Sequence, residues 1–218
     1  MAKTTLTISS KNYSSWSMRG WLMVKLAGIS FTEIPVATDD IDARAELLLL
    51  APSILVPYLT HGHAKVWDTM AIGEYLNELV PEAGLLPSNL VHRAHCRAIC
   101  GEMHSGFSSL RASLPMNIKA RFKKFKVWSR ALRDIERVFY IWRDCLETYK
   151  GPYLFGKRPT LADAMFAPVV TRFVTYGIPM DTVCEKYCQQ ILSMPAVQEW
   201  VAAAQVEPDQ IDELEVEF

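Results

Sequence analysis

The sequence predicts a mixed α/β unit over residues 1–80, a linker over 81–90, an all-helical unit over 91–206 and an acidic tail over 207–218. Short runs in which apolar and polar residues alternate, typical of half-buried strands, fall in the first unit. Beyond the linker, apolar residues recur every three or four positions, which is the spacing of one helix face. The order of these patterns predicts a βαβ-ββα arrangement followed by a helical domain.

The expected α/β unit has two parts. The first two strands flank a helix that Gly28 ends, so they should pair in parallel. The last two are separated by residues 61–63, which suit a tight hairpin turn, so they should pair antiparallel. The expected elements, in order, are strand 6–8, helix 15–27, strand 31–36, a short helix 42–50, strands 56–59 and 65–67, and helix 68–79.

Two long apolar stripes dominate the second unit. They predict two long amphipathic helices, one from Cys96 to Leu114 and one from Phe122 to Tyr149, the second ended by Gly151-Pro152. Three further helices are expected over 160–176, 181–193 and 195–205.

Composition and charge exclude several classes of protein. Half of the residues are hydrophobic, and a chain of 218 residues buries about 70% of its unfolded surface, so the chain is neither disordered nor fibrous. The 23 basic and 24 acidic residues nearly cancel, which argues against a nucleic-acid partner. The basic run from Lys119 to Arg130 alternates with core-facing aromatics, so we expect it to be the solvated face of a helix.

The expected location is the cytoplasm. The first residues lack the apolar segment of an export signal. The longest uncharged stretch, 47–64, contains prolines and histidines that a membrane-spanning helix would not tolerate, so no membrane partner is expected. Five cysteines without a CxxC pair suit reduced, buried thiols.

Ser14, Ser15 and Trp16 stand where the first strand gives way to the first helix. A serine at such a position caps the helix by accepting a hydrogen bond from an orphan N–H group. The hydroxyl and the free N–H groups at the positive helix end can also hold a thiolate and lower its pKa. The residues themselves leave both roles open.

Three other motifs stand at element boundaries. Val56-Pro57 stands at the entrance of an expected strand, where the proline is most simply trans. Asp68-Thr69 can cap a helix or present its N-terminus to a ligand carboxylate. Thr160 and Asp163 have the spacing of a capping box, and Pro168 should kink the following helix or be tolerated through packing.

In their order and spacing these motifs resemble the glutathione S-transferase family over nearly the whole chain. The similarity is closest to serine-type bacterial and zeta-like members, and the runs 102–107 and 164–173 are similar to a bacterial subgroup. The resemblance implies a thioredoxin-like domain before a helical domain, and a homodimer. It also implies detoxification by conjugating glutathione, as co-substrate, to a small hydrophobic electrophile.

The resemblance also assigns roles to residues of the α/β unit. Either Ser14 or Ser15 would hydrogen-bond the glutathione sulfur and favour its thiolate, and the resemblance does not separate the two. The glutathione-binding residues that it implies are Leu55 and Val56, whose backbone would pair with the cysteinyl part, Pro57 after a cis peptide bond, and Asp68 and Thr69 at the γ-glutamyl end.

Two departures from the family pattern keep other functions open. Members often carry a polar or basic residue before Val-Pro, where this chain has Ile54-Leu55, and Asp68 replaces the more usual Glu or Gln. A non-catalytic member that binds glutathione or a protein is therefore one alternative. A zeta-like isomerase that uses glutathione without consuming it is another.

The electrophile would lie between the domains. The candidate wall residues are Trp16, Met103, His104, Phe107 and Arg111. Met103 and Phe107 lie on the apolar stripe, so core packing is their simpler role, whereas His104 lies on a polar face.

No metal is expected. A tetrahedral site needs ligands that surround the ion, and a single straight helix cannot supply them. The histidines and cysteines considered, His92, His95, Cys96, Cys100 and His104, all fall on one expected helix.

Overall fold

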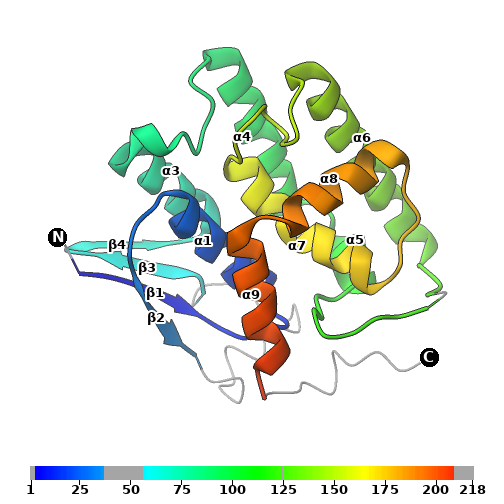
Figure 1. Ribbon diagram of the computed structural model, residues 1–218, viewed down its shortest axis with the longest axis horizontal. Helices are drawn as coiled ribbons and strands as arrows, with labels where there is room; N and C mark the ends of the chain where they lie inside the picture. Colours follow the sequence, from blue (N-terminus) through cyan, green and yellow to red (C-terminus); the bar gives the residue numbers. More distant parts are fainter. Residues whose placement is uncertain (1–2, 37–55, 124, 209–218) are drawn as a thin grey trace.

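The computed structural model describes residues 3–36, 56–123 and 125–208 (Figure 1). Four strands form one mixed sheet in the order β2-β1-β3-β4. β1 pairs in parallel with β2 and antiparallel with β3, and β3 pairs antiparallel with β4, which confirms the expected βαβ-ββα order. The strand bounds are β1 (Thr4–Ile8), β2 (Thr32–Pro35), β3 (Tyr58–His61) and β4 (Ala64–Trp67).

Two helices complete the described part of the α/β unit. α1 (Ser15–Leu26) crosses between the parallel strands, and α3 (Thr69–Leu79) follows β4. The expected helix over 42–50 lies outside the described residues. Asp68 caps α3, as its sequence position predicts.

The helical domain follows a 3-10 turn, η1 (Pro81–Ala83), in the expected linker. α7 is buried along almost its whole length, and Figure 1 shows it running through the middle of this domain, packed against α1, α4 and α8. The helix bounds are α4 (Leu90–Ser105), α5 (Ser108–Ser113), α6 (Ser129–Tyr149), α7 (Leu161–Thr175), α8 (Thr182–Leu192) and α9 (Pro195–Val206).

The first expected long helix is wrong as a single element. α4 ends at Ser105, and Phe107 takes a left-handed conformation with φ of 56° before α5 begins. The Phe107 side chain nevertheless stays in the core, and the Asp134 carboxylate accepts the Leu110 N–H near the start of α5. The apolar stripe therefore continues across a break in the helix because it reports burial rather than helicity.

The second long helix begins later than the sequence predicts. α6 starts at Ser129, and the described residues of 122–128 are not helical. Phe122 and Phe125 instead pack against Tyr176, with ring centroids 5.1 and 4.6 Å apart. The basic run is correspondingly not the face of one helix, since most of it precedes α6.

Pro168 is accommodated inside α7, which is assigned without interruption from Leu161 to Thr175. Nearly every residue of α7 is buried, and the Thr171 hydroxyl donates a hydrogen bond to the Pro168 carbonyl. Packing thus compensates for the hydrogen bond that Pro168 removes from the helix, as the sequence predicts.

Asn12 ties the α/β unit to the helical domain. Its side chain donates to Asn117 Oδ1 at 3.1 Å and accepts the Lys119 N–H at 3.0 Å, while its carbonyl accepts the Ile118 N–H. Its own N–H donates to Glu207 Oε2 at 2.7 Å. Glu207 begins the expected acidic tail, of which residues 209–218 lie outside the described part of the chain.

All five cysteines are free and buried, as expected from their sequence pattern. Burial raises the pKa of Cys145 to about 12, so its thiolate is scarce at neutral pH. Among the described residues, no helix combines the length and the apolar character needed to cross a bilayer.

Candidate functional site

Ser14 is the N-cap of α1. Its hydroxyl oxygen accepts the Ser17 N–H at 3.2 Å, and its proton is donated to Ser17 Oγ at 2.9 Å. Ser17 Oγ in turn accepts the Ser9 N–H. Ser14 is therefore engaged in a local network that starts the helix.

Ser15 is the first residue of α1 and has a different environment. Its hydroxyl oxygen receives a 3.4 Å contact from Arg19 Nη1, and its proton has no acceptor among the residues that the structure describes. Arg19 is completely buried and is held by a 2.8 Å hydrogen bond from its Nε to the Met165 carbonyl of α7. Ser15 thus offers a donor at the positive end of a helix, supported by a cation.

Pro57 lies against α1. The Val56–Pro57 peptide bond is cis, as the family resemblance implies and contrary to the trans form that the sequence alone favours. Gly20 makes the close approach possible, because a Cβ at this position would lie 2.6 Å from Pro57 Cβ and Cγ. Leu55 lies outside the described residues.

Replacing Gly20 with alanine is expected to destabilise the protein by about 1–3 kcal/mol, because the added methyl group meets a rigid proline ring. Denaturant unfolding measures this change. Gly101→Ala in α4 is the control: beyond its chain neighbours and its own helix backbone, no described atom lies within 4 Å of the added Cβ, so this change should be neutral or stabilising by up to about 1 kcal/mol. Equal stability of the two variants would refute the close packing of α1 on Pro57.

Asp68 and Thr69 at the start of α3 meet His104 of α4. His104 Nε2 lies 3.1 Å from Asp68 Oδ2, and its Nδ1 lies 3.4 Å from Thr69 Oγ1. Burial raises the pKa of Asp68, but hydrogen bonds from His104 and the Met70 N–H outweigh this and leave the pKa below its ordinary value. His104 therefore links the expected glutathione residues to the helical domain.

Trp16 brings the expected wall residues together. Its ring meets His104 edge-on at 5.1 Å, and the Arg19 and Arg111 guanidinium groups lie 4.6 and 5.5 Å from its ring centroid. Met103 and Phe107, by contrast, belong to the hydrophobic core. The structure thus assembles Trp16, His104 and Arg111 and places the two apolar candidates in packing positions.

Two family models match this sequence. The model of the glutathione S-transferase N-terminal domain matches residues 13–79, and that of the C-terminal domain matches residues 107–203. The chain belongs to the glutathione S-transferase family. The residues around Ser15, Pro57 and Asp68 lie within the first match, and the helices that carry Arg111 and Met165 lie within the second.

Curated relatives of this family member carry two kinds of name. Glutathione S-transferase 1 of Dianthus caryophyllus is 32% identical over 137 residues, 62% of each chain, so the match spans less than two thirds of that relative. A probable maleylacetoacetate isomerase of Caenorhabditis elegans is 24% identical over 156 residues, 72% of each chain.

Solved structures show the same fold. A maleylacetoacetate isomerase of Anaeromyxobacter dehalogenans superposes with a TM-score of 0.68 at 23% identity, covering 97% of this chain and 96% of its own. A Burkholderia glutathione transferase homologue with bound glutathione gives a TM-score of 0.67 at 22% identity, covering 94% of this chain and 99% of its own.

Sequence reasoning missed two arginines of this family member. The sequence patterns assign no role to Arg19 of α1 or to Arg172 of α7, yet both are buried beside the site. Their signal in the sequence is a single cation within an otherwise apolar stretch of helix, where an unpaired charge is costly.

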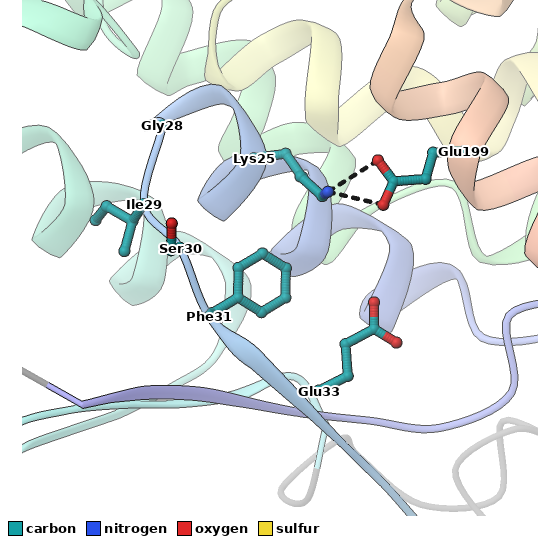
Figure 2. Close-up of a pocket in the computed structure, with 7 residues that line it drawn as sticks. All are labelled: Lys25, Gly28, Ile29, Ser30, Phe31, Glu33 and Glu199. Atoms are coloured by element: carbon teal, nitrogen blue, oxygen red, sulfur yellow. Dashed lines mark hydrogen bonds and ion pairs between the residues drawn. The ribbon is translucent and has the colours of Figure 1, made fainter.

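A surface pocket of about 470 Å³ lies at the opposite end of α1 from Ser15 (Figure 2). Its charged groups are already paired: Lys25 contacts both carboxylate oxygens of Glu199, and Glu33 pairs with Lys11. At 1.5 Å per residue the length of α1 separates the pocket from Ser15 by roughly 15 Å. This pocket is therefore distinct from the candidate site.

Proposed function

We propose that this protein is a glutathione transferase in which Ser15 stabilises the thiolate of bound glutathione. The observation that carries the proposal is the different hydrogen bonding of the two serines at the start of α1. Ser14 donates its proton to Ser17, whereas the Ser15 proton has no acceptor among the described residues. A free thiol has a pKa of about 8.5 and is mostly protonated at neutral pH. A hydroxyl donor at a helix N-terminus raises the reactive thiolate fraction.

The remaining contacts would position the tripeptide. The resemblance gives Val56 and the cis Pro57 a strand-like pairing with the cysteinyl part, and it gives Asp68 and Thr69 the γ-glutamyl end. The N-terminus of α3 supports this assignment, because its N–H groups suit a carboxylate. The electrophile would then approach the sulfur beside Trp16. The resemblance also supports a cytoplasmic homodimer, which light scattering would test.

A glutathione-dependent isomerase is the second candidate. It is favoured by the relatives named maleylacetoacetate isomerase, in Caenorhabditis elegans and Rattus norvegicus among others. The two reactions differ in the fate of glutathione, because conjugation consumes it and isomerisation returns it. Measuring total free thiol during turnover separates them.

Calorimetric titration with reduced glutathione at neutral pH, with S-hexylglutathione as a second ligand, tests the proposed function. Binding of both in the micromolar to millimolar range is expected. The absence of heat with either ligand would overturn the proposal and favour a fold retained for partner binding.

A further inference from the structure

Three arginine side chains from three helices converge beside Ser15. Arg19 comes from α1, Arg111 from α5 and Arg172 from α7. Arg19 and Arg172 are 0% and 3% exposed, and Arg111 is half-buried. The Arg19 and Arg111 guanidinium groups lie against the same Trp16 ring, and their charges act on one another and on Arg172.

Each of these arginines has N–H groups without a partner. No hydrogen-bond acceptor within the described parts of the chain serves Arg19 Nη2, Arg111 Nε, or Arg172 Nε and Nη1. Leaving a buried donor unpaired costs about 1–3 kcal/mol, and more for a charged group. A native fold that holds several such donors together is therefore prepared for an acceptor.

Within the described parts of the chain, no carboxylate forms an ion pair with this cluster. None of the ion pairs formed among residues 3–36, 56–123 and 125–208 includes Arg19, Arg111 or Arg172. Asp134 acts electrostatically on Arg111, but one of its carboxylate oxygens already accepts the Leu110 N–H.

Three arginines on the surface show the opposite behaviour. Arg97 pairs with Glu74, and Arg137 pairs with Glu102, each through two hydrogen bonds of 2.6–2.8 Å. Arg143 likewise contacts Asp181 at 2.9 Å. Among the described residues, the fold thus pairs these three solvated arginines with carboxylates, whereas no ion pair reaches Arg19, Arg111 or Arg172, where a partner matters more.

We propose that Arg19, Arg111 and Arg172 form an anion site that receives a carboxylate of the electrophile. This inference rests on the proposed function, since Ser15 places the sulfur beside the cluster. Guanidinium groups match carboxylates through paired, charge-assisted hydrogen bonds. The substrate class is therefore a small electrophile that carries a carboxylate, rather than a purely hydrophobic one.

Burial lowers the pKa of all three arginines, and that of Arg172 stays above neutral pH. Burial, followed by the neighbouring charge of Arg111, lowers the pKa of Arg172 to about 9. Burial also lowers the pKa of Arg111, which nearby Asp134 partly restores. A bound carboxylate would relieve the repulsion among the three groups.

Binding of succinate, compared with uncharged succinamide at constant ionic strength, tests the site in the full-length protein. We expect succinate to raise the melting temperature and to change the fluorescence of Trp16, with succinamide having no effect. Arg111→Gln should weaken succinate binding about tenfold or more, because a charge-assisted contact is lost. Arg137→Gln, which removes an exposed arginine already paired with Glu102, should leave succinate binding unchanged.

Activity provides a second measurement. 4-Chloro-3,5-dinitrobenzoate and its benzamide undergo the same reaction, in which the thiolate forms a C–S bond and chloride leaves. The wild-type protein should favour the benzoate in kcat/KM, and Arg111→Gln should remove most of that preference. Because Arg111 is only half-buried, this variant is the one expected to fold, as its circular dichroism should confirm.

Glutathione also carries carboxylates, and the Arg111→Gln variant distinguishes a cluster that binds glutathione from one that binds the electrophile. If Arg111→Gln weakens glutathione binding and leaves succinate binding intact, the cluster belongs to glutathione and the inference is wrong. An equal response of the wild-type protein to succinate and succinamide would also overturn it. Succinate binding that depends on Arg111, without any glutathione binding, would retain the anion site and reject the proposed function.

Discussion

Replacing Ser15 with alanine is expected to lower kcat/KM for glutathione conjugation by roughly 100-fold or more, the usual cost of losing one hydrogen-bond donor to a developing or stabilised anion. The pKa of the bound thiol should return toward its free value of about 8.5, so less thiolate is present at neutral pH. Thiolate absorbance titration of the complex measures the pKa directly, and steady-state kinetics measures the rate.

Ser14→Ala provides the matched control. Its loss removes the α1 cap, so stability should fall by about 1 kcal/mol while the thiol pKa changes little. The double variant should combine a raised thiol pKa with the loss of stability. The reverse pattern, with the pKa shift in Ser14→Ala and not in Ser15→Ala, would assign the sulfur contact to Ser14.

Asp163→Ala is expected to cost about 3–5 kcal/mol of the free energy of unfolding, because it leaves several buried donors without an acceptor. The Asp163 carboxylate is buried and accepts the Leu154 and Thr160 N–H groups at 3.1 and 2.8 Å, the Thr160 hydroxyl at 3.0 Å and the Tyr187 hydroxyl at 3.2 Å. Burial raises the pKa of this carboxyl, and the four donors counter that effect.

Urea or guanidinium unfolding at neutral pH, compared at equal m values, measures the loss. Asp181→Ala is the control, because Asp181 caps α8 in an exposed position through the Val183 and Cys184 N–H groups. That change should cost only about 1 kcal/mol. Similar losses in the two variants would show that burial adds nothing to the capping contacts of Asp163.

Local signals in the sequence were sufficient for the strands and the caps. Asp68 starts α3 and Thr160 with Asp163 starts α7 because capping depends on residues within one helical turn. The break at Phe107 depends instead on distant contacts, which no local spacing reveals. The same is true of Phe122, whose packing on Tyr176 keeps it in the apolar stripe without a helix.

The candidate site was predictable only in part. The sequence places Ser14 and Ser15 at the helix start, but the choice between them depends on which of the two hydroxyls is hydrogen-bonded to Ser17. The cis bond before Pro57 came from family resemblance, since physical odds favour trans. The burial of Arg172 follows from how α7 packs, which the sequence does not specify.

The contacts of Asn12 have a consequence for how the protein unfolds. Separating the two domains would break, in one step, the hydrogen bonds that the Asn12 side chain and backbone make to residues 117–119 and to Glu207. The two domains are therefore not independent folding units, and we expect a single two-state unfolding transition. A ligand held by the α/β unit then protects α9 from amide exchange as effectively as it protects the sheet, since both must open together.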